Sequence, residues 1–221
     1  MRSPRVTRRA RVWAAVIRAL LAPPLCWSCH APAVRGRPLC RACRATLRFL
    51  GPEPVTIGGV AVWAPVAYEA AAAQLVKALK FHGATAVADE LAALLVATAP
   101  PGVLEGALVP VPLHPARERA RGFNQATVIA RAVRRRDRGR LAIADCLRRR
   151  GPDRRQVGGG RAVRLAGPAG SITARGPVPD SALLVDDVVT TGATLAACAA
   201  ALRAAGAGSV RAVAFARTPG R

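Results

Sequence analysis

The sequence predicts an α/β fold, with a doubly wound, mainly parallel sheet and a small cysteine-rich module at the N-terminus. Three observations lead to this prediction. From residue 60 onward, segments with strand character alternate with segments with helix character, which is the pattern of a parallel sheet covered by helices. Residues 183–185 (LLV) form an apolar run with the length of a strand buried on both faces. Four cysteines at residues 26–43 lie outside this alternation.

Length and composition set the scale of the domains and the kind of partner. The chain has 221 residues, enough for one α/β domain of about 150 residues and a small accessory module. The hydrophobic content is 52% but the aromatic content only 4%, so we expect an aliphatic core. The net charge of +22 comes almost entirely from arginine and favours phosphorylated substrates, nucleic acid or an anionic membrane. Compositional bias explains the charge equally well, because Ala, Arg, Gly and Pro are all abundant.

Residues 1–22 predict a basic amphipathic helix that packs on the domain. Arginines crowd the first 11 residues, but Arg18 interrupts the apolar part that follows, and no small-x-small cleavage site comes after it. A secretory signal peptide is therefore not favoured. No apolar run reaches the roughly 18 residues of a membrane span, so we expect no transmembrane segment and a cytoplasmic location. Binding to a membrane surface is the alternative role for this helix.

Residues 23–50 predict a zinc ribbon. Cys26, Cys29, Cys40 and Cys43 have the spacing C-x2-C-x10-C-x2-C, which lets two tight turns each direct two thiolates at one Zn²⁺ ion. Four thiolates fill a tetrahedral site and leave no position for a substrate, so the expected role of the metal is structural. Two disulfides are the alternative, and the unfavoured signal peptide weighs against them.

The main domain is predicted at residues 60–221, after a linker rich in Pro and Gly at residues 51–59. Its elements are assigned from apolar periodicity and from Pro and Gly breaks. In chain order they are a strand at 60–68, a helix at 70–81, a helix at 85–98, a strand and turn at 107–114, a helix ending near 136, a strand at 144–147 and a final strand at 209–216.

Residues 183–194 (LLVDDVVTTGAT) contain the strongest candidate site. Two carboxylates follow the apolar run, and a turn of small, hydroxyl-bearing residues leads into an Ala-rich helix at 195–205. Backbone N–H groups and hydroxyls at a helix N-terminus favour a phosphate. Carboxylates beside them cannot hold the phosphate, but they accept hydrogen bonds from sugar hydroxyls or hold Mg²⁺ through water. This combination suits a ribose 5-phosphate, whereas acids that merely cap the turn are the plain structural alternative.

The same stretch resembles the signature of type I phosphoribosyltransferases, which bind phosphoribosyl pyrophosphate (PRPP) through apolar residues, two acids, two apolar residues and TTG-x-T. The resemblance implies that fold for the main domain. It also implies that Asp186 and Asp187 meet the ribose hydroxyls, assist Mg²⁺ and are catalytic. The implied PRPP-binding residues of this stretch are Asp186, Asp187, Val188, Val189, Thr190, Thr191, Gly192, Ala193 and Thr194.

A second segment, VPVPLHPARERARGFNQA at residues 109–126, is similar to the one that marks ComF-type competence proteins, a branch of that family. The cysteine module, YEAAAAQLVKALKFHG and the tail ARTPGR also look like that group. Arg117 and Arg121 are four residues apart, so in a helix they share one face, which suits a pyrophosphate; an exposed basic loop is the alternative. The resemblance implies that Pro112, Leu113 and His114, with Arg117, bind the pyrophosphate of PRPP and that Arg121 is catalytic.

Residues 134–170 are dense in Arg and Gly. The resembling proteins carry a mobile loop here that closes over the site, as lids do to exclude water. Gln156 and Arg161 stand where that pattern has a Gln and an Arg, whereas the Asn that usually follows is missing from residues 164–166. An Arg/Gly segment that binds anions without specificity is the alternative.

The expected function is therefore binding of PRPP with Mg²⁺ and transfer of its phosphoribosyl group to an acceptor that the sequence does not identify. A nucleophile would displace pyrophosphate from ribose C1, with catalysis by positioning and electrostatics. The alternative is a non-catalytic adaptor that responds to PRPP or a nucleotide and binds single-stranded DNA during uptake, as the competence resemblance implies. Scarce aromatic residues (4%) weaken direct stacking on DNA bases.

Overall fold

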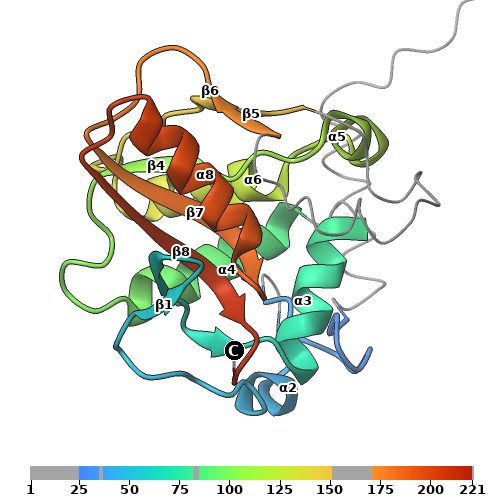
Figure 1. Cartoon of the computed structure of the whole chain (residues 1–221). Helices are drawn as coiled ribbons and strands as arrows, with labels where there is room; N and C mark the ends of the chain where they lie inside the picture. The colour runs from blue at the N-terminus through green and yellow to red at the C-terminus, as the bar shows by residue number, and fades with distance from the viewer. Residues whose placement is uncertain (1–24, 35–36, 82–84, 151–170, 221) are drawn as a thin grey trace, which may run out of the picture.

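Figure 1 presents the computed structural model of the chain, which describes residues 25–34, 37–81, 85–150 and 171–220. The helix predicted at residues 1–22 and the loop residues Gln156 and Arg161 lie outside these ranges.

A mostly parallel sheet of six strands forms the centre of the structure, as predicted. Its main path runs β1-β2-β8-β7-β4, and β3 pairs with a later part of β8. Strand β8 is parallel to β2, β3 and β7, and β4 is parallel to β7, while β1 is antiparallel to β2. The strands are β1 (Val55–Ile57), β2 (Val60–Trp63), β3 (Val66–Ala67), β4 (Ala107–Pro110), β7 (Ser181–Val189) and β8 (Ser209–Arg217).

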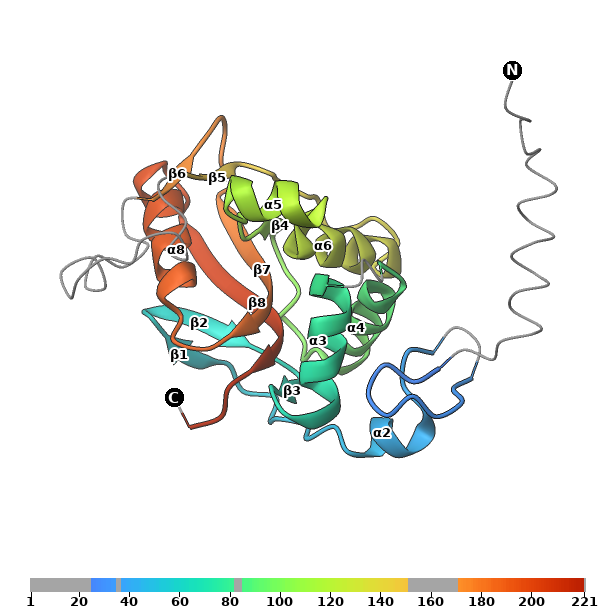
Figure 2. The same ribbon diagram turned by 90° about the vertical axis from the view of Figure 1, so that its right-hand side faces the viewer.

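Helices cover both faces of this sheet, as Figure 2 shows, with α3 (Ala70–Phe81), α4 (Thr85–Thr98) and α6 (Gln125–Arg136) on one side and α8 (Ala193–Ala204) on the other. Alternation along β7 supplies both interfaces, because successive side chains of a strand point to opposite faces. Leu183 and Val185 belong to the core with α3, α4 and α6, whereas Leu184 belongs to the core with α8. The run LLV is thus buried on both faces, as a doubly wound sheet requires.

The predicted linker at residues 51–59 contains β1, an antiparallel edge strand of the sheet. Val55 pairs with Val62, and Ile57 with Val60, across a two-residue turn. Gly58 and Gly59 both have positive φ in this turn, and such Gly-Gly loops favour hairpins. The linker prediction was wrong because the glycines here form a tight turn between paired strands rather than an irregular segment.

A proline and a glycine also interrupt two elements that were predicted to be continuous. The strand predicted at 60–68 is separated into β2 and β3 at Pro65, which has no N–H to donate to a ladder. The helix predicted to run to residue 136 is two helices, α5 (Pro115–Arg121) and α6. Gly122 ends α5 with a φ of +82°, and the side chain of Asn124 caps α6 by accepting from the N–H of Ala126 at 3.0 Å.

Two short antiparallel strands form a second sheet next to α8. It consists of β5 (Leu147–Arg149) and β6 (Ile172–Ala174), which are antiparallel. The strand predicted at 144–147 therefore begins later than expected. Ala144 instead donates its N–H to the carbonyl of Leu108 at 2.9 Å, which places this stretch along the outer edge of β4.

Gly192 offers a test of how β1 supports the start of α8. It has a φ of +72°, and a Cβ there would lie 2.4 Å from Ile57 Cγ2 and 3.1 Å from the Ile57 carbonyl carbon. Gly59 has nearly the same φ of +73°, but a Cβ there meets nothing within 4 Å. We expect Gly59→Ala to lower the free energy of unfolding by about 1 kcal/mol, the cost of the left-handed conformation. Gly192→Ala adds an overpacking cost of roughly 1–3 kcal/mol.

Urea unfolding of both variants, followed by circular dichroism, measures this difference. Equal losses would mean that Ile57 moves aside without cost and that β1 does not support the turn.

Candidate functional site

The two acids of the predicted site lie inside β7 rather than after it. The strand continues through them to Val189, with Asp186 opposite Ala214 of β8. Asp187 is 2% exposed, whereas Asp186 is partly buried. The pairing with β8 outweighs the low strand propensity of aspartate, so both carboxylates are carried by the rigid sheet.

A lysine that the sequence did not assign to the site contacts the second acid. Lys80, at the C-terminal end of α3, places its Nζ 2.6 Å from Oδ2 of Asp187. The backbone N–H of Asp187 donates to Oδ1 of Asp186 at 2.8 Å. Burial, and then the neighbouring Asp187 carboxylate, raise the pKa of Asp186 well above its ordinary value. The two acids are therefore unequal, with Asp187 held as the partner of an ammonium group.

The threonine-rich turn and the first residues of α8 enclose a small hollow next to Asp186. Thr190 and Thr191 are exposed, and Gly192 is the N-cap of α8 without a side-chain hydrogen bond to the helix. The first N–H groups of a helix have no partner within it. The hollow is lined by Asp186, Val188, Val189, Thr190, Thr191, Gly192, Ala193, Thr194 and Leu195, which include every residue assigned to this motif except Asp187.

The end of β4 lies beside the end of β7, because the two strands are parallel neighbours. Pro110 is in register with Val185, and the N–H of Val111 donates to the Val185 carbonyl at 3.0 Å. The structure thus brings residues 111–114 and the acidic pair to the same edge of the sheet, as the sequence predicted. His114 caps α5, since its Nδ1 accepts from the N–H of Ala116 at 3.2 Å. One of its two ring nitrogens is therefore already engaged in the hydrogen bond that caps α5.

Arg117 and Arg121 both belong to α5, as their spacing suggested. The guanidinium of Arg121 donates to the side chain of Gln125 and lies 5.8 Å from the centre of the Phe81 ring. Burial lowers the pKa of Arg121, while the Asp187 carboxylate opposes this and Arg117 adds to it. Arg121 and Asp187 are thus close enough to interact electrostatically.

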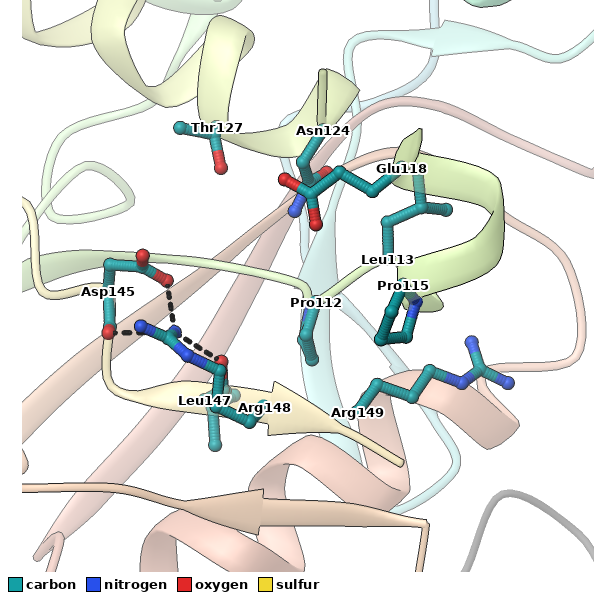
Figure 3. Close-up of a pocket in the computed structure, with 10 residues that line it drawn as sticks. All are labelled: Pro112, Leu113, Pro115, Glu118, Asn124, Thr127, Asp145, Leu147, Arg148 and Arg149. Atoms are coloured by element: carbon teal, nitrogen blue, oxygen red, sulfur yellow. Dashed lines mark hydrogen bonds and ion pairs between the residues drawn. The ribbon is translucent and has the colours of Figure 1, made fainter. Parts of the chain in front are cut away.

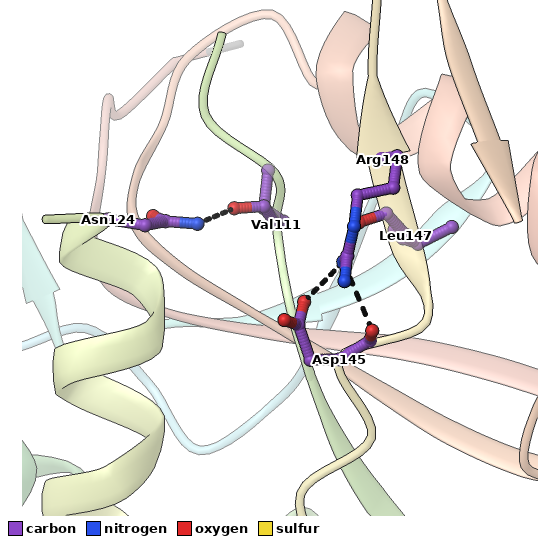
Figure 4. A network of polar contacts seen from close by, with 5 residues as sticks. All are labelled: Val111, Asn124, Asp145, Leu147 and Arg148. Atoms are coloured by element: carbon purple, nitrogen blue, oxygen red, sulfur yellow. Dashed lines mark hydrogen bonds and ion pairs between the residues drawn. The ribbon is translucent and has the colours of Figure 1, made fainter. Parts of the chain in front are cut away.

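A cavity of about 270 Å³ borders this edge on the outer side of β4 (Figure 3). Pro112 and Leu113 line it together with α5, α6 and β5. Figure 4 shows how its walls are held: Asn124 donates to the Val111 carbonyl at 3.0 Å, and Arg148 bonds to Asp145 at 2.8 Å. The cavity therefore combines apolar prolines and leucine with charged side chains that are already paired in part.

The four cysteines form a cluster that can hold a metal ion such as zinc. All four sulfur atoms lie within 4.8 Å of one another, and those of Cys29 and Cys40 are 3.7 Å apart. Tetrahedral zinc with Zn–S bonds of about 2.3 Å places its sulfurs roughly 3.8 Å apart. Burial raises the pKa of Cys26, but N–H bonds from Cys40, Cys29 and Ser28 outweigh it and bring that pKa to about 6. In Cys43 a bond with Ser28 lowers the pKa, but the neighbouring Cys29 thiol and burial outweigh it and bring that pKa to about 12.

The cysteine module packs directly on the helical layer. Cys26, Leu39 and Leu47 belong to the same buried cluster as Leu75 and Leu79 of α3. An ion pair between Arg44, in α2 (Arg41–Ala45), and Glu90 of α4 adds to this contact. A metal ion in the module would therefore stabilise the side of the domain that carries Lys80.

Comparisons with known proteins find no matching family and only a distant structural similarity. Neither a scan against protein-family models nor a search of curated proteins finds a match. Among solved structures, UMP synthase from Leishmania donovani matches 76% of this chain at 15% sequence identity with a TM-score of 0.31. The match covers 28% of the length of that protein. Within the described residues, the helices are all too short or too polar to span a bilayer.

The metal site can be tested through Cys29, the exposed member of the cluster. We expect the purified protein to contain about one zinc ion per chain. Cys29→Ser is expected to lose the ion on dialysis and to unfold at a lower temperature, because binding of a structural metal contributes to folding. Elemental analysis and thermal unfolding measure both effects.

Cys146→Ala provides the control, since Cys146 is a buried thiol outside the cluster. Full zinc content in Cys29→Ser, or two disulfides in the native protein by mass spectrometry, would contradict a four-thiolate site.

Proposed function

We propose that this chain is a phosphoribosyltransferase-like protein of the ComF type, which binds PRPP with Mg²⁺ and transfers its phosphoribosyl group to an acceptor. One observation carries the proposal: the acidic pair, the hollow at the start of α8 and the arginines of α5 gather at the carboxyl ends of β7 and β4. Ligands of α/β sheets bind at such ends. Anion donors and sugar-hydroxyl acceptors side by side match a phosphorylated ribose.

Each part of PRPP finds a matching group in this arrangement. The hydroxyls of Thr190, Thr191 and Thr194 and the N–H groups at the start of α8 would hold the 5-phosphate. Asp186 and Asp187 would accept hydrogen bonds from the ribose hydroxyls. Pro112, Leu113 and His114 after the end of β4, with Arg117, would hold the pyrophosphate.

The acid pair also fits Mg²⁺, which prefers carboxylate oxygens and retained waters. Because Oδ2 of Asp187 already contacts Lys80, Asp186 is the better donor, directly or through water. When bound, Mg²⁺ would neutralise charge on the pyrophosphate oxygens.

Transfer would proceed by cleavage of the bond between ribose C1 and the pyrophosphate oxygen as the acceptor forms its own bond to C1. Positive charge develops on the ribose, and the carboxylates of Asp186 and Asp187 would stabilise it. Negative charge develops on the leaving pyrophosphate, and Arg121 with Arg117 would stabilise it. The protein would act by orientation and by fixed charges, with no side chain required as a general base.

A second candidate function rests on the basic end of α6. Four exposed arginines, Arg131, Arg134, Arg135 and Arg138, line a hollow of about 430 Å³. With a net charge of +22, this surface suits a polyanion such as single-stranded DNA. In that case the PRPP site would act as a sensor of a ligand rather than as a catalyst.

PRPP binding tests the first proposal. We expect calorimetry with PRPP and Mg²⁺ to give binding that Asp186→Asn/Asp187→Asn weakens at least about tenfold, which corresponds to about 1.4 kcal/mol. The loss follows from removal of two charged acceptors for the ribose hydroxyls. Asp89→Asn is the matched control, because Asp89 is an acid on α4 paired with Arg135. Unchanged affinity in the double variant, or no binding by the native protein, would refute the proposed site.

DNA binding tests the second candidate. Each phosphate contact on single-stranded DNA contributes about −0.7 to the slope of log affinity against log salt concentration. Arg134→Ser/Arg138→Ser is therefore expected to make that slope shallower by up to roughly 1.4, whereas Asp186→Asn/Asp187→Asn leaves it unchanged. Fluorescence anisotropy with a labelled oligonucleotide over a salt series measures the slope. Absence of binding at low salt would reject this function.

A further inference from the structure

The contact between Lys80 and Asp187 joins two parts of the chain that are far apart in sequence. Helix α3 ends beside the carboxyl end of β7, and Lys80 lies in its last turn. Its side chain is 25% exposed, and that of Asp187 is 3% exposed. The pair is therefore largely removed from water, unlike the exposed ion pair of Arg48 and Glu69, whose side chains are about half exposed.

Lys80 is the ion-pair partner of this buried acid. Among the described residues, Oδ2 of Asp187 has no hydrogen-bond donor, and the ammonium group of Lys80 is its ion-pair partner. A buried carboxylate that loses its partner is strongly destabilised in its charged form. The ammonium group is compact and has three donors, so it can hold one carboxylate oxygen and still face the site.

The same end of α3 also contacts an arginine that interacts electrostatically with the acid. Phe81, the residue after Lys80, lies against the Arg121 guanidinium, which Gln125 holds through its side-chain oxygen. Lys80 of α3 thus contacts Asp187, and Arg121 of α5 interacts with it electrostatically. Two adjacent carboxylates would repel a polyanionic ligand, and these cations offset that repulsion.

We propose that Lys80 is a positioning residue of the PRPP site, whose ammonium group holds the Asp187 carboxylate in the orientation that meets the ribose hydroxyls. This role rests on the proposed function. It assigns to α3 a part in ligand binding that neither the acid motif nor the arginine segment contains.

Two lysines on one helix make the experiment well controlled. Lys77 and Lys80 are the only lysines in the chain, and Lys77 is exposed on α3. We expect Lys80→Met to weaken PRPP binding about tenfold in calorimetry with Mg²⁺, and Lys77→Met to change it less than twofold. Methionine keeps most of the apolar stem of lysine, so the difference reports the charge. Lys80→Arg is expected to recover part of the affinity, which a role of the stem in packing would not produce.

A double-mutant cycle separates positioning from a general structural role. If Lys80 acts through Asp187, Lys80→Met adds little to the loss already caused by Asp187→Asn, because coupled residues are non-additive. Independent, additive losses would overturn the proposal. If Asp187→Asn weakens PRPP binding and Lys80→Met does not, the role of Lys80 is refuted while the proposed PRPP site stands. Absence of binding by the native protein would refute the proposed function, and this role with it.

Amine modification gives a measurement that does not depend on the folding of Lys80→Met. Acetylation followed by mass spectrometry compares both lysines within one native protein. We expect Lys77 to react at least several-fold faster than Lys80, PRPP with Mg²⁺ to slow Lys80 alone, and Asp187→Asn to remove most of the difference. Equal rates at the two lysines in the native protein would overturn the ion pair and the role built on it.

Discussion

The parallel pairing of β7 with β4 and with β8 is the constraint on which the candidate site depends. It aligns Val185 with Pro110 on one side and Asp186 with Ala214 on the other. Parallel strands end at the same edge of a sheet, so groups that follow β4 meet groups at the end of β7. Without this alignment, the acidic pair and the arginines of α5 would be two unrelated polar segments.

Charge balance at that edge is the second organising feature. Two carboxylates lie where an anionic ligand is proposed to bind, and cations from two separate helices offset their negative charge. Lys80 contacts Asp187 directly, and Arg121 interacts with it over a longer distance. The cysteine module contributes indirectly, because Cys26 and Leu39 pack in the same core as α3, which carries Lys80. The cysteine module and the Lys80–Asp187 ion pair thus both rest on α3.

Several elements could be predicted from sequence because their signals are local. Helices α3 and α4 have the predicted bounds, since apolar spacing and flanking prolines or glycines define them. The cysteine cluster is likewise explained by its spacing. The predicted linker was wrong because Pro and Gly mark a hairpin turn as readily as an irregular segment, and only the pairing of Val55 with Val62 distinguishes them. The prediction of one continuous helix was wrong, because Gly122 has a positive φ and ends α5.

The sequence by itself determined the mainly parallel α/β architecture, the four-cysteine cluster and the residues of the acid and threonine motif, because each follows from short-range patterns and side-chain chemistry. Only the tertiary structure decided that Lys80 faces Asp187 and that Phe81 lies against Arg121. Those contacts depend on where α3 crosses the ends of the strands. That placement comes from packing of its apolar face against the whole core, and no local pattern around Lys80 encodes it.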